Sequence, residues 1–317
     1  MVTIKKRRVG TGTYYYLQHS IRKGPKVQSK EIYLGRKIPK NIEEIKGKLL
    51  KTIYEKEWYP LLDRIKEKYS KEIKLMPRSS REKQMEIFAS RFTYNTQRIE
   101  GSKLTLKETA NLLEKGITPK DKPLEDVKEA EAHKRLFYAE VLISKKKDLS
   151  LNLVVEWHRN LFQETKPDIA GKIRKHQTRI SGSKFIPPLP VEVYPLLREF
   201  FKWYDRNKGK IELHHPVELA AFVHLKFVTI HPFGDGNGRI SRLMMNFVLN
   251  KEGYPMLDIP YSGRNSYYTA LERAQIRKVD SVFIQWFMRK YVKENDAYLN
   301  KTNTPFTMFA GEAIDRK

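Results

Sequence analysis

One short segment of the chain holds most of the groups that phosphate chemistry requires. It reads HPFGDGNGRISR and covers residues 231–242. His231 offers an imidazole that is largely neutral near pH 7, so it can take a proton from an attacking hydroxyl as a general base. Asp235 offers a hard carboxylate oxygen of the kind that binds Mg²⁺ together with waters and substrate phosphates. The segment therefore predicts a catalytic base beside a metal ligand.

The rest of the segment favours the binding of an anion. Gly234, Gly236 and Gly238 stand at alternate positions, and glycine allows left-handed backbone that brings N–H groups close to a ligand. Asn237 can donate from its amide, and we expect it to cap a helix over 238–251. The N-terminus of that helix would then point at the same anion.

Two arginines follow on the predicted helix. Arg239 and Arg242 are three positions apart, so we expect both guanidinium groups to lie on one face and to share a polyphosphate. An EF-hand loop starting at Asp235 fails, because its sixth and twelfth positions are Ile240 and Asn246 where Gly and Glu are required. The chain contains no GxxxxGK[ST] phosphate loop either. A plain solvated turn is the remaining alternative.

The pattern HxFxDGNGRxxR is the signature of the Fic (filamentation induced by cAMP) domain, and residues 231–242 fill every specified position. This resemblance implies transfer of a nucleotidyl group, usually AMP from Mg·ATP, to a hydroxyl side chain of another protein. By the same resemblance, His231 deprotonates that hydroxyl and Asp235 carries Mg²⁺. Asn237 and the glycine amides bind the α- and β-phosphates, and Phe233 is an anchor in the core.

Several other histidines lie close to the signature in sequence. We expect a helix over 216–230 to deliver His231 at its end, because apolar residues recur there at helical spacing. His214, His215 and His224 could suggest a zinc site, but the chain has no cysteine and no HExxH spacing. We interpret these three histidines as structural.

A second feature lies upstream, where residues 96–101 read TQRIEG. We expect a helix over 81–99, with Gly101 at the position after the cap that ends such a helix. Glu100 then faces the negative end of the helix dipole, so a cationic partner is expected to compensate it. A solvated carboxylate at a helix end is the ordinary alternative.

The segment 96–101 also resembles the inhibitory motif [S/T]xxxE[G/N] of the Fic family. This resemblance implies that Glu100 pairs with Arg242, the arginine that should hold the γ-phosphate, so that ATP binds unproductively. Thr96 lies one turn earlier on the same helix face. Because the motif precedes the signature, the chain resembles the subgroup whose inhibitory helix is N-terminal. That subgroup also suggests removal of AMP from a modified target, with Glu100 positioning the attacking water, and the sequence does not decide between the two directions.

Two further segments resemble parts of the family. Residues 171–190 suit a short β-hairpin turning at Gly182, and resemble the family's flap. A protein target would add an extended segment to its edge near 178–188, with a hydroxyl facing the catalytic base.

Residues 264–271 resemble the segment that closes over the adenine. Adjacent helical residues point about 100° apart, so we expect only one of Tyr267 and Tyr268 to meet the base.

Composition indicates a mainly α protein of one large domain with a smaller addition, because 317 residues with 40% hydrophobic content can bury a sizeable core. We expect a Fic-type helical domain with a β-hairpin flap, plus a small N-terminal β meander and helix. The predicted domains are 1–78, 79–298 and a tail at 299–317. Besides those named above, helices are predicted over 105–116, 123–146, 150–164, 191–207 and 279–295.

The N-terminal part differs from the rest. Residues 14–19 and 31–34 are predicted as strands, and a long helix is expected over 42–69. The net charge of the chain is +25, and residues 1–50 hold 13 Lys and Arg against 3 Asp and Glu. This part could be a nucleic-acid-binding module with Tyr14, Tyr15 and Tyr16 stacking on bases, or a basic surface of a Lys-rich chain.

The sequence also bears on location and partners. No secretory segment and no run long enough to span a membrane is expected, so we predict a cytoplasmic protein that does not enter the membrane. ATP, Mg²⁺ and a protein target are the expected partners, and the subgroup resemblance suggests a homodimer. A different class of function also stays open: a binding protein that reuses the Fic scaffold, with its basic N-terminal part contacting nucleic acid.

Overall fold

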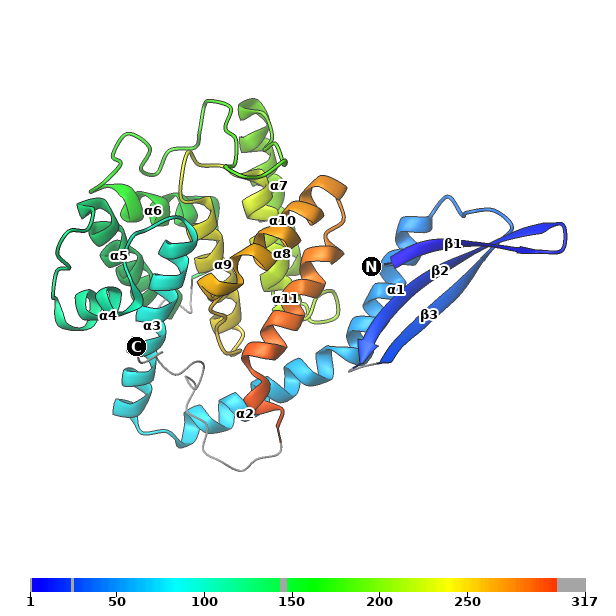
Figure 1. The fold of residues 1–317 in the computed structure, drawn as a ribbon, viewed down its shortest axis with the longest axis horizontal. Coiled ribbons are helices and arrows are strands. Elements are labelled where there is room, and N and C mark those ends of the chain that lie inside the picture. The colour runs from blue at the N-terminus through cyan, green and yellow to red at the C-terminus, as the bar shows by residue number, and fades with distance from the viewer. Residues whose placement is uncertain (1, 24–25, 143–146, 301–317) are drawn as a thin grey trace. The chain divides into compact units, whose positions relative to one another are not determined.

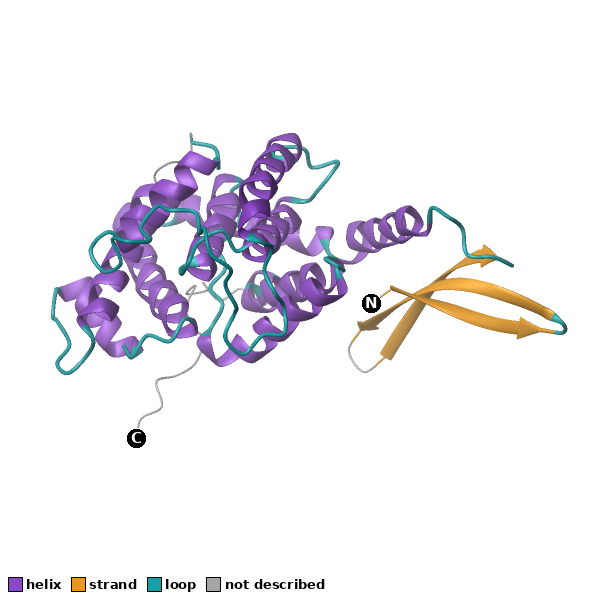
Figure 2. Ribbon diagram, turned by 90° about the horizontal axis from the view of Figure 1, so that it is seen from above, coloured by secondary structure: helices purple, strands orange, loops and turns teal. Residues whose placement is uncertain are grey.

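The computed structural model describes residues 2–23, 26–142 and 147–300. The chain forms two compact units, residues 1–63 and residues 64–317. Among the described residues, strands occur only in the first unit, whereas the second is built from helices and loops (Figures 1 and 2). The predicted division into domains at 78/79 and 298/299 stays a prediction, and most of the predicted tail lies outside the described residues.

The first unit contains a three-stranded antiparallel sheet in the order β1-β2-β3, with β1 at Val2–Val9, β2 at Gly12–Lys23 and β3 at Lys26–Gly35. The predicted strands fall within β2 and β3. β1 was not predicted, because its sequence VTIKKRRV contains four consecutive cations that hide the alternation of a half-buried strand. The structure explains this composition, since β1 is an edge strand exposed from Thr3 to Val9.

The single helix predicted over 42–69 is two helices. α1 covers Ile42–Glu57 and α2 covers Tyr59–Leu75, with a break at Trp58. Pro60 accounts for the break, because proline lacks a backbone N–H and its ring clashes with the carbonyl four residues earlier in a continuous helix. Trp58 closes α1 by donating to Tyr54 O at 2.9 Å.

The second unit places two buried helices at its centre. α8 (Pro216–Ile230) and α9 (Asn237–Lys251) are joined by the loop that contains the signature, and both are buried along most of their lengths. This burial on several faces explains why α8 reads as nearly continuous apolar sequence. The surrounding helices are α3 (Arg78–Ile99), α4 (Leu106–Lys115), α5 (Leu124–Leu136), α6 (Leu151–Phe162), α7 (Pro190–Asn207), α10 (Arg264–Arg277) and α11 (Ser281–Glu294).

Most helices predicted in this unit occur within a few residues of the expected bounds. The predicted helix 123–146 is an exception, because α5 passes into a π-helix, η1, over Phe137–Leu142, and residues 143–146 lie outside the described residues. α10 was not predicted as a separate helix. Two short 3₁₀ helices, η2 (Tyr261–Gly263) and η3 (Asp296–Tyr298), precede α10 and follow α11.

The segment predicted as a β-hairpin flap contains its turn but no strands. Gly182 has a φ of 73°, and Ser183 N–H donates to Ile180 O at 3.1 Å. The arms on either side form no ladder of backbone hydrogen bonds, so the described residues 172–189 are an irregular loop. Side chains hold it instead: Gln177 Nε2 donates to Pro187 O at 3.0 Å, and the Lys184 N–H donates to Glu272. Among the described residues, no helix is both long and apolar enough to cross a membrane.

Candidate active site

His231 lies at the end of α8, where the chain leaves the helix. Its N–H donates to Phe227 O at 3.1 Å, and its φ of 52° is left-handed, so the helix ends at this residue. Nδ1 lies 3.3 Å from the Val228 carbonyl oxygen; because a carbonyl only accepts, Nδ1 carries the proton and Nε2 keeps its electron pair. Burial lowers the pKa of His231, which favours the neutral imidazole near pH 7. This is the protonation state that a general base needs.

The loop between α8 and α9 depends on one left-handed glycine. Gly236 caps α9 with a φ of 78°, and a Cβ at this position would collide with the ring of Phe162. Gly234 and Gly238 do not have a positive φ, so the expected left-handed backbone occurs at one of the three glycines. The first N–H groups of α9 have no carbonyl one turn earlier in the helix to accept from them, which makes this helix end suitable for an anion.

The side chain of Asn237 is engaged inside the loop. Its Oδ1 accepts from the Phe233 N–H and its Nδ2 donates to the Phe233 carbonyl, each at 2.9 Å. The expected role as N-cap is wrong, because Gly236 is the cap and Asn237 is the first helical residue. Asn237 instead fixes the loop around Phe233, whose ring is 1% exposed in the core. The backbone N–H of Asn237 lies in the first turn of α9, where an anion can meet it.

Two residues that the sequence did not single out also hold this loop. His158 accepts from the Gly171 N–H at Nδ1, at 2.9 Å, so its Nε2–H donates to the Asp235 carbonyl at 3.0 Å. Arg174 donates to the His231 carbonyl at 2.8 Å and to the Pro188 carbonyl at 2.6 Å. Arg174 therefore ties the loop 172–189 to the end of α8.

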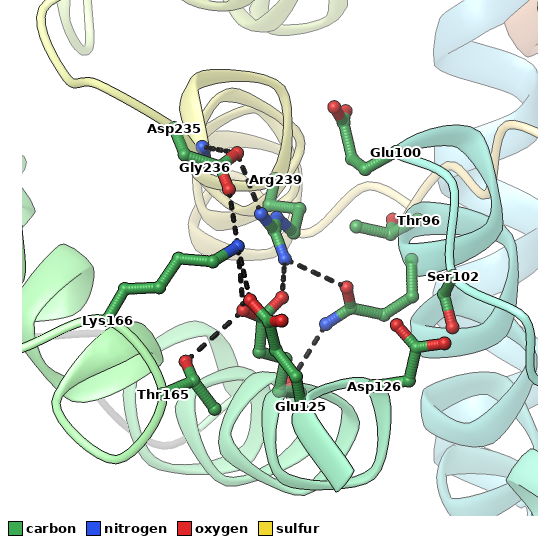
Figure 3. Close-up of polar contacts among 12 residues, drawn as sticks. Thr96, Glu100, Ser102, Glu125, Asp126, Thr165, Lys166, Asp235, Gly236 and Arg239 are labelled. Carbon is green, nitrogen blue, oxygen red and sulfur yellow. Dashed lines mark hydrogen bonds and ion pairs between the residues drawn. The ribbon is translucent and has the colours of Figure 1, made fainter. Parts of the chain in front are cut away.

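The carboxylate of Asp235 lies between two cations (Figure 3). Lys166 Nζ is 2.8 Å from Oδ2, and Arg239 donates to Oδ1 at 2.9 Å. Burial alone would raise the pKa of Asp235, but these cations outweigh it and hold the pKa well below its usual range. Lys166 also contacts Glu125 at 2.7 Å and Glu129 at 3.2 Å. The ammonium group is thus shared by three carboxylates.

Arg239 and Arg242 are held by different sets of partners, and their expected binding of a polyphosphate stays a prediction. Arg239 is buried and binds Glu129 and Asp235, with its guanidinium 4.7 Å from the centre of the Phe162 ring. Arg239 also donates to Gln97 of α3 at 3.1 Å. Arg242 contacts Thr96 and Glu100 at the end of the same helix, and Tyr267 of α10.

The structure brings Glu100 and Arg242 together. Arg242 Nη2 lies 2.6 Å from Glu100 Oε1, and its side chain also donates to the hydroxyl of Thr96 at 3.3 Å and to the Thr96 carbonyl at 3.2 Å. Glu100 and Thr96 thus use one face of α3 to hold a single guanidinium. The Arg242 side chain is 1% exposed, whereas that of Glu100 is 26% exposed, so the pair lies at the boundary of the interior.

The end of α3 aims Glu100 at this partner. The Gly101 N–H donates to Arg98 O at 3.2 Å, and the Ser102 N–H donates to Gln97 O at 3.1 Å, which is the Schellman pattern. Gly101 has a φ of 106°, a conformation that favours glycine. The Glu100 carboxylate also lies directly over the Cα of Gly238, where a Cβ would collide with Oε1. Glu100 therefore occupies the N-terminal end of α9, next to the predicted phosphate site.

Tyr267 and Tyr268 play different parts. Tyr267 is 1% exposed, and its hydroxyl lies 2.9 Å from His224 Nε2 and 3.3 Å from Arg242. Tyr268 is 42% exposed and donates to the carbonyl of Ile99 at 3.0 Å. Tyr267 is thus the core residue of the pair, and Tyr268 borders the end of α3.

The remaining histidines near the signature have local partners. His215 caps α8 by accepting from the Val217 N–H and contacts the Tyr254 hydroxyl at 3.0 Å. His214 lies 3.3 Å from Glu218. Among the described residues, no group of three or more His, Cys, Asp or Glu side chains is placed to hold a metal by itself.

Comparison with known proteins agrees with the motif. Residues 148–249 match the model of the Fic/DOC family. "Protein adenylyltransferase Fic" of Drosophila yakuba is 33% identical over 211 residues, which are 66% of this chain and 42% of the relative. "Protein adenylyltransferase fic-1" of Caenorhabditis briggsae is 30% identical over 227 residues, 71% of this chain and 43% of the relative. The chain thus spans less than half the length of these curated relatives.

Solved structures give the same result for the fold. A Fic domain containing signaling protein from Bacteroides thetaiotaomicron superposes with a TM-score of 0.65 at 27% identity, over 74% of this chain and 96% of that one. Fic-1 (residues 134–508) from C. elegans superposes with a TM-score of 0.66 at 25% identity, over 82% and 76%. His231, Asp235 and Arg242 all lie in the matched region 148–249. The chain therefore contains a Fic domain and belongs, through it, to the Fic/DOC family.

Proposed function

We propose that the chain is an autoinhibited protein adenylyltransferase that transfers AMP from Mg·ATP to a Ser, Thr or Tyr hydroxyl of a protein. The observation that carries the proposal is the position of Glu100, whose carboxylate binds Arg242 at 2.6 Å and covers Gly238 at the start of α9. The complete signature and the relatives named protein adenylyltransferase support the reaction itself.

The forward reaction would use His231 as base. The hydroxyl oxygen attacks the α-phosphorus, its proton passes to Nε2 of His231, and the bond from the α-phosphorus to the bridging oxygen breaks, releasing pyrophosphate. The Nδ1 contact with Val228 supports this role, because it keeps Nε2 free to accept. The N-terminus of α9 would stabilise the negative charge on the phosphates.

The ionisation state of Asp235 supports a role as a Mg²⁺ ligand. Its lowered pKa keeps the carboxylate ionised, and a site with one carboxylate relies on substrate phosphates and water for the remaining ligands. Mg²⁺ would neutralise charge on the phosphates when bound. Lys166 already contacts Oδ2 of Asp235, so its ammonium group would have to leave this oxygen when Mg²⁺ binds there. The ammonium group could then remain paired with Glu125 and Glu129.

Inhibition would act through Arg242. If this guanidinium binds the γ-phosphate, Glu100 competes for the same donor and also repels a phosphate at Gly238. ATP would then sit with its α-phosphate out of line for attack, which is costly because transfer depends on alignment. A protein target would approach along the loop 172–189, whose arms form no backbone ladder with each other and which Arg174 holds against His231.

Incubation of the Glu100→Gly variant with ATP labelled at the α-phosphate tests the proposal. We expect the variant to label itself or a target, the wild-type chain to label far less, and the double variant Glu100→Gly, His231→Ala to give none. Glu82→Gly is the matched control, because it places the same substitution on α3 away from the site. Label that arrives from the γ-phosphate, or equal labelling by Glu82→Gly, contradicts the proposal.

The reverse reaction is a second candidate, in which the enzyme removes AMP from a modified target. One contact favours it: among the described contacts, Arg242 binds Oε1 of Glu100, which leaves Oε2 to orient a water molecule. Self-labelled Glu100→Gly protein, freed of nucleotide, would serve as substrate for the wild-type chain. Loss of label that requires intact Glu100 and His231 indicates this direction, whereas stable label opposes it.

A further inference from the structure

One face of the N-terminal sheet gathers aromatic rings and cations. In the sheet register Tyr16 is opposite both Lys5 and Tyr33, and Tyr14 is opposite Arg7, so these side chains project from the same face. Arg36 follows β3 and reaches Tyr14. We call this set the tyrosine face; it consists of Lys5, Arg7, Tyr14, Tyr16, Tyr33 and Arg36.

The opposite face of the sheet is the one that is covered. Leu17 is 0% exposed and His19 is 4% exposed, and both alternate with the tyrosine face along β2. Lys30, on the covered side, pairs with Glu57 at the end of α1 at 3.6 Å. The tyrosine face is therefore the solvent side of this unit, and Tyr33 is 55% exposed there.

The rings and guanidinium groups of this face form a contiguous surface. The Tyr16 and Tyr33 rings are 5.3 Å apart, and the Tyr14 and Tyr33 rings are 6.3 Å apart. Arg7 lies 4.6 Å over the Tyr16 ring, and Arg36 lies 5.6 Å over the Tyr14 ring. Planar groups that lie side by side on an open sheet can stack on unpaired bases, while their cationic edges meet phosphates.

Charge also favours a polyanion as the partner. Residues 1–63 hold 15 Lys and Arg against six Asp and Glu, in a fifth of the chain. β1 adds Lys6 and Arg8 at the exposed edge, on the side opposite the tyrosine face. Glu31 also lies on the tyrosine face, but Arg7 neutralises it at 2.7 Å.

We propose that the tyrosine face binds single-stranded nucleic acid. Bases stack on Tyr16 and Tyr33, and Lys5, Arg7 and Arg36 contact the phosphates. A duplex hides its base faces, so it meets only the cations and binds more weakly. An acidic protein or an anionic membrane likewise uses the charge without needing the rings.

Fluorescence anisotropy with the full-length chain and a labelled oligo-uridine of about 12 nucleotides tests the proposal. Tyr33→Ala should weaken binding by about fivefold or more, the scale of one lost base stack, while Tyr33→Phe keeps the ring and restores binding. Tyr15→Ala is the matched control, because Tyr15 lies on the other face of β2. His231→Ala should bind like the wild type, so this result is independent of the proposed catalysis.

A pair of double variants separates recognition from general attraction. Lys5→Gln with Arg7→Gln and Lys6→Gln with Arg8→Gln remove equal charge from opposite faces of one exposed strand. The first pair should weaken binding more, with a smaller slope of log affinity against log salt. Equal losses for both pairs, equal affinity for a duplex, no binding of the oligonucleotide, or tighter binding to phosphatidylserine vesicles would overturn the proposal.

Discussion

At the scale of single residues, the ionised groups of the site already have partners. Arg242 is held by Glu100, and Asp235 is held by both Lys166 and Arg239. A nucleotide and its metal would therefore enter by exchanging partners. Lys166 is the partner better able to leave Asp235, because its side chain is 31% exposed whereas that of Arg239 is 4% exposed.

Replacing Lys166 with Met should tighten the binding of Mn²⁺ in the presence of ADP. The substitution removes a positive charge from Oδ2 of Asp235, and a shift of about 1.4 kcal/mol would appear as a tenfold lower Kd. Titration of free Mn²⁺ by electron paramagnetic resonance measures this directly, without turnover.

The exposed Lys172 supplies the control for this experiment, because Lys172→Met removes the same charge six residues further on. It should leave the Mn²⁺ affinity within about twofold of wild type, since exposed charges at a distance are screened by salt. Weaker Mn²⁺ binding in Lys166→Met would show that Lys166 orients Asp235 and does not compete with the metal.

The pair of Glu100 and Arg242 was predicted from the resemblance of residues 96–101 and 231–242 to two motifs of the Fic family. The helix end alone predicted only that Glu100 has some cationic partner. Lys166, His158 and Arg174 were not predicted. Their partners in the signature loop lie 57 to 77 positions away in the chain, and an isolated Lys, His or Arg carries no local signal of such a contact. Only the packing of α6, the turns that follow it and the loop 172–189 beside the signature makes these residues part of the site.

At the scale of elements, the end of α3 decides where the Glu100 carboxylate lies. The helix contributes Thr96 and Glu100 from one face, and the Schellman pattern at Gly101 fixes the backbone that carries them. Tyr268 donates to the carbonyl of Ile99 and adds a support from α10. The position of the carboxylate therefore depends on how well this helix end is formed.

Gly101→Ala should destabilise the chain and weaken inhibition together. No atom lies within 4 Å of the Cβ that would be added, so the cost comes from the φ of 106° and amounts to about 1–2 kcal/mol. Urea unfolding measures the loss, and labelling from the α-phosphate of ATP should rise above the wild-type level.

Gly209→Ala is the matched control for this strain. Gly209 has a φ of 70° with no atom within 4 Å of an added Cβ, and it follows α7 away from Glu100. A comparable loss of stability is expected, with labelling unchanged from wild type. If both variants raise labelling equally, general loosening of the fold is responsible and the helix end has no special role.

The bounds of elements were predictable where one local signal dominated. α8 was predicted at its observed residues, and α4, predicted over 105–116, begins with a capping box of Thr105 and Glu108. The break at Trp58 was missed, although Pro60 was visible, because the apolar pattern continues through it. The flap was predicted with strands that the structure lacks, since its arms are joined by the side chains of Arg174 and Gln177 and not by a ladder of backbone hydrogen bonds.

At the scale of the whole molecule, buried histidines should make stability depend on pH. Burial lowers the pKa of His133 to about 3, of His158 to about 4 and of His224 to about 3. Below pH 6.5 the unfolded chain binds protons at these residues while the folded chain does not, so the free energy of unfolding falls as pH falls. Asp258 opposes this below pH 6, because burial raises its pKa to about 6 and the folded chain then takes up a proton.

Thermal unfolding between pH 7 and pH 5 should therefore show a falling Tm. Each neutral buried histidine contributes up to about 1.4 kcal/mol per pH unit below 6.5. His133→Gln should reduce the dependence of the free energy of unfolding on pH by the contribution of one histidine, whatever its effect on stability at pH 7. A slope that is unchanged in this variant would show that His133 is protonated in the folded chain.

The two-unit organisation could be inferred from composition, because the basic, aromatic N-terminal part contrasts with the helical pattern beyond it. The alternation of a strand already places Tyr14 and Tyr16 on one face and Tyr15 on the other. That Lys5, Arg7 and Tyr33 share the face of Tyr14 and Tyr16 could not be inferred, because it depends on the register with β1 and β3. Pairing between strands is set by contacts across the sheet that a single strand does not record.

If Glu100 inhibits as proposed, its placement on the same chain as Arg242 determines how that inhibition responds to conditions. A carboxylate tethered in this way acts at a fixed effective concentration, on the order of millimolar or higher for a short connection, and dilution does not lower it. An inhibitor on a separate polypeptide would dissociate as the protein is diluted. The activity of each wild-type molecule should thus stay equally low from nanomolar to micromolar protein, and only an event that moves the end of α3 would release it.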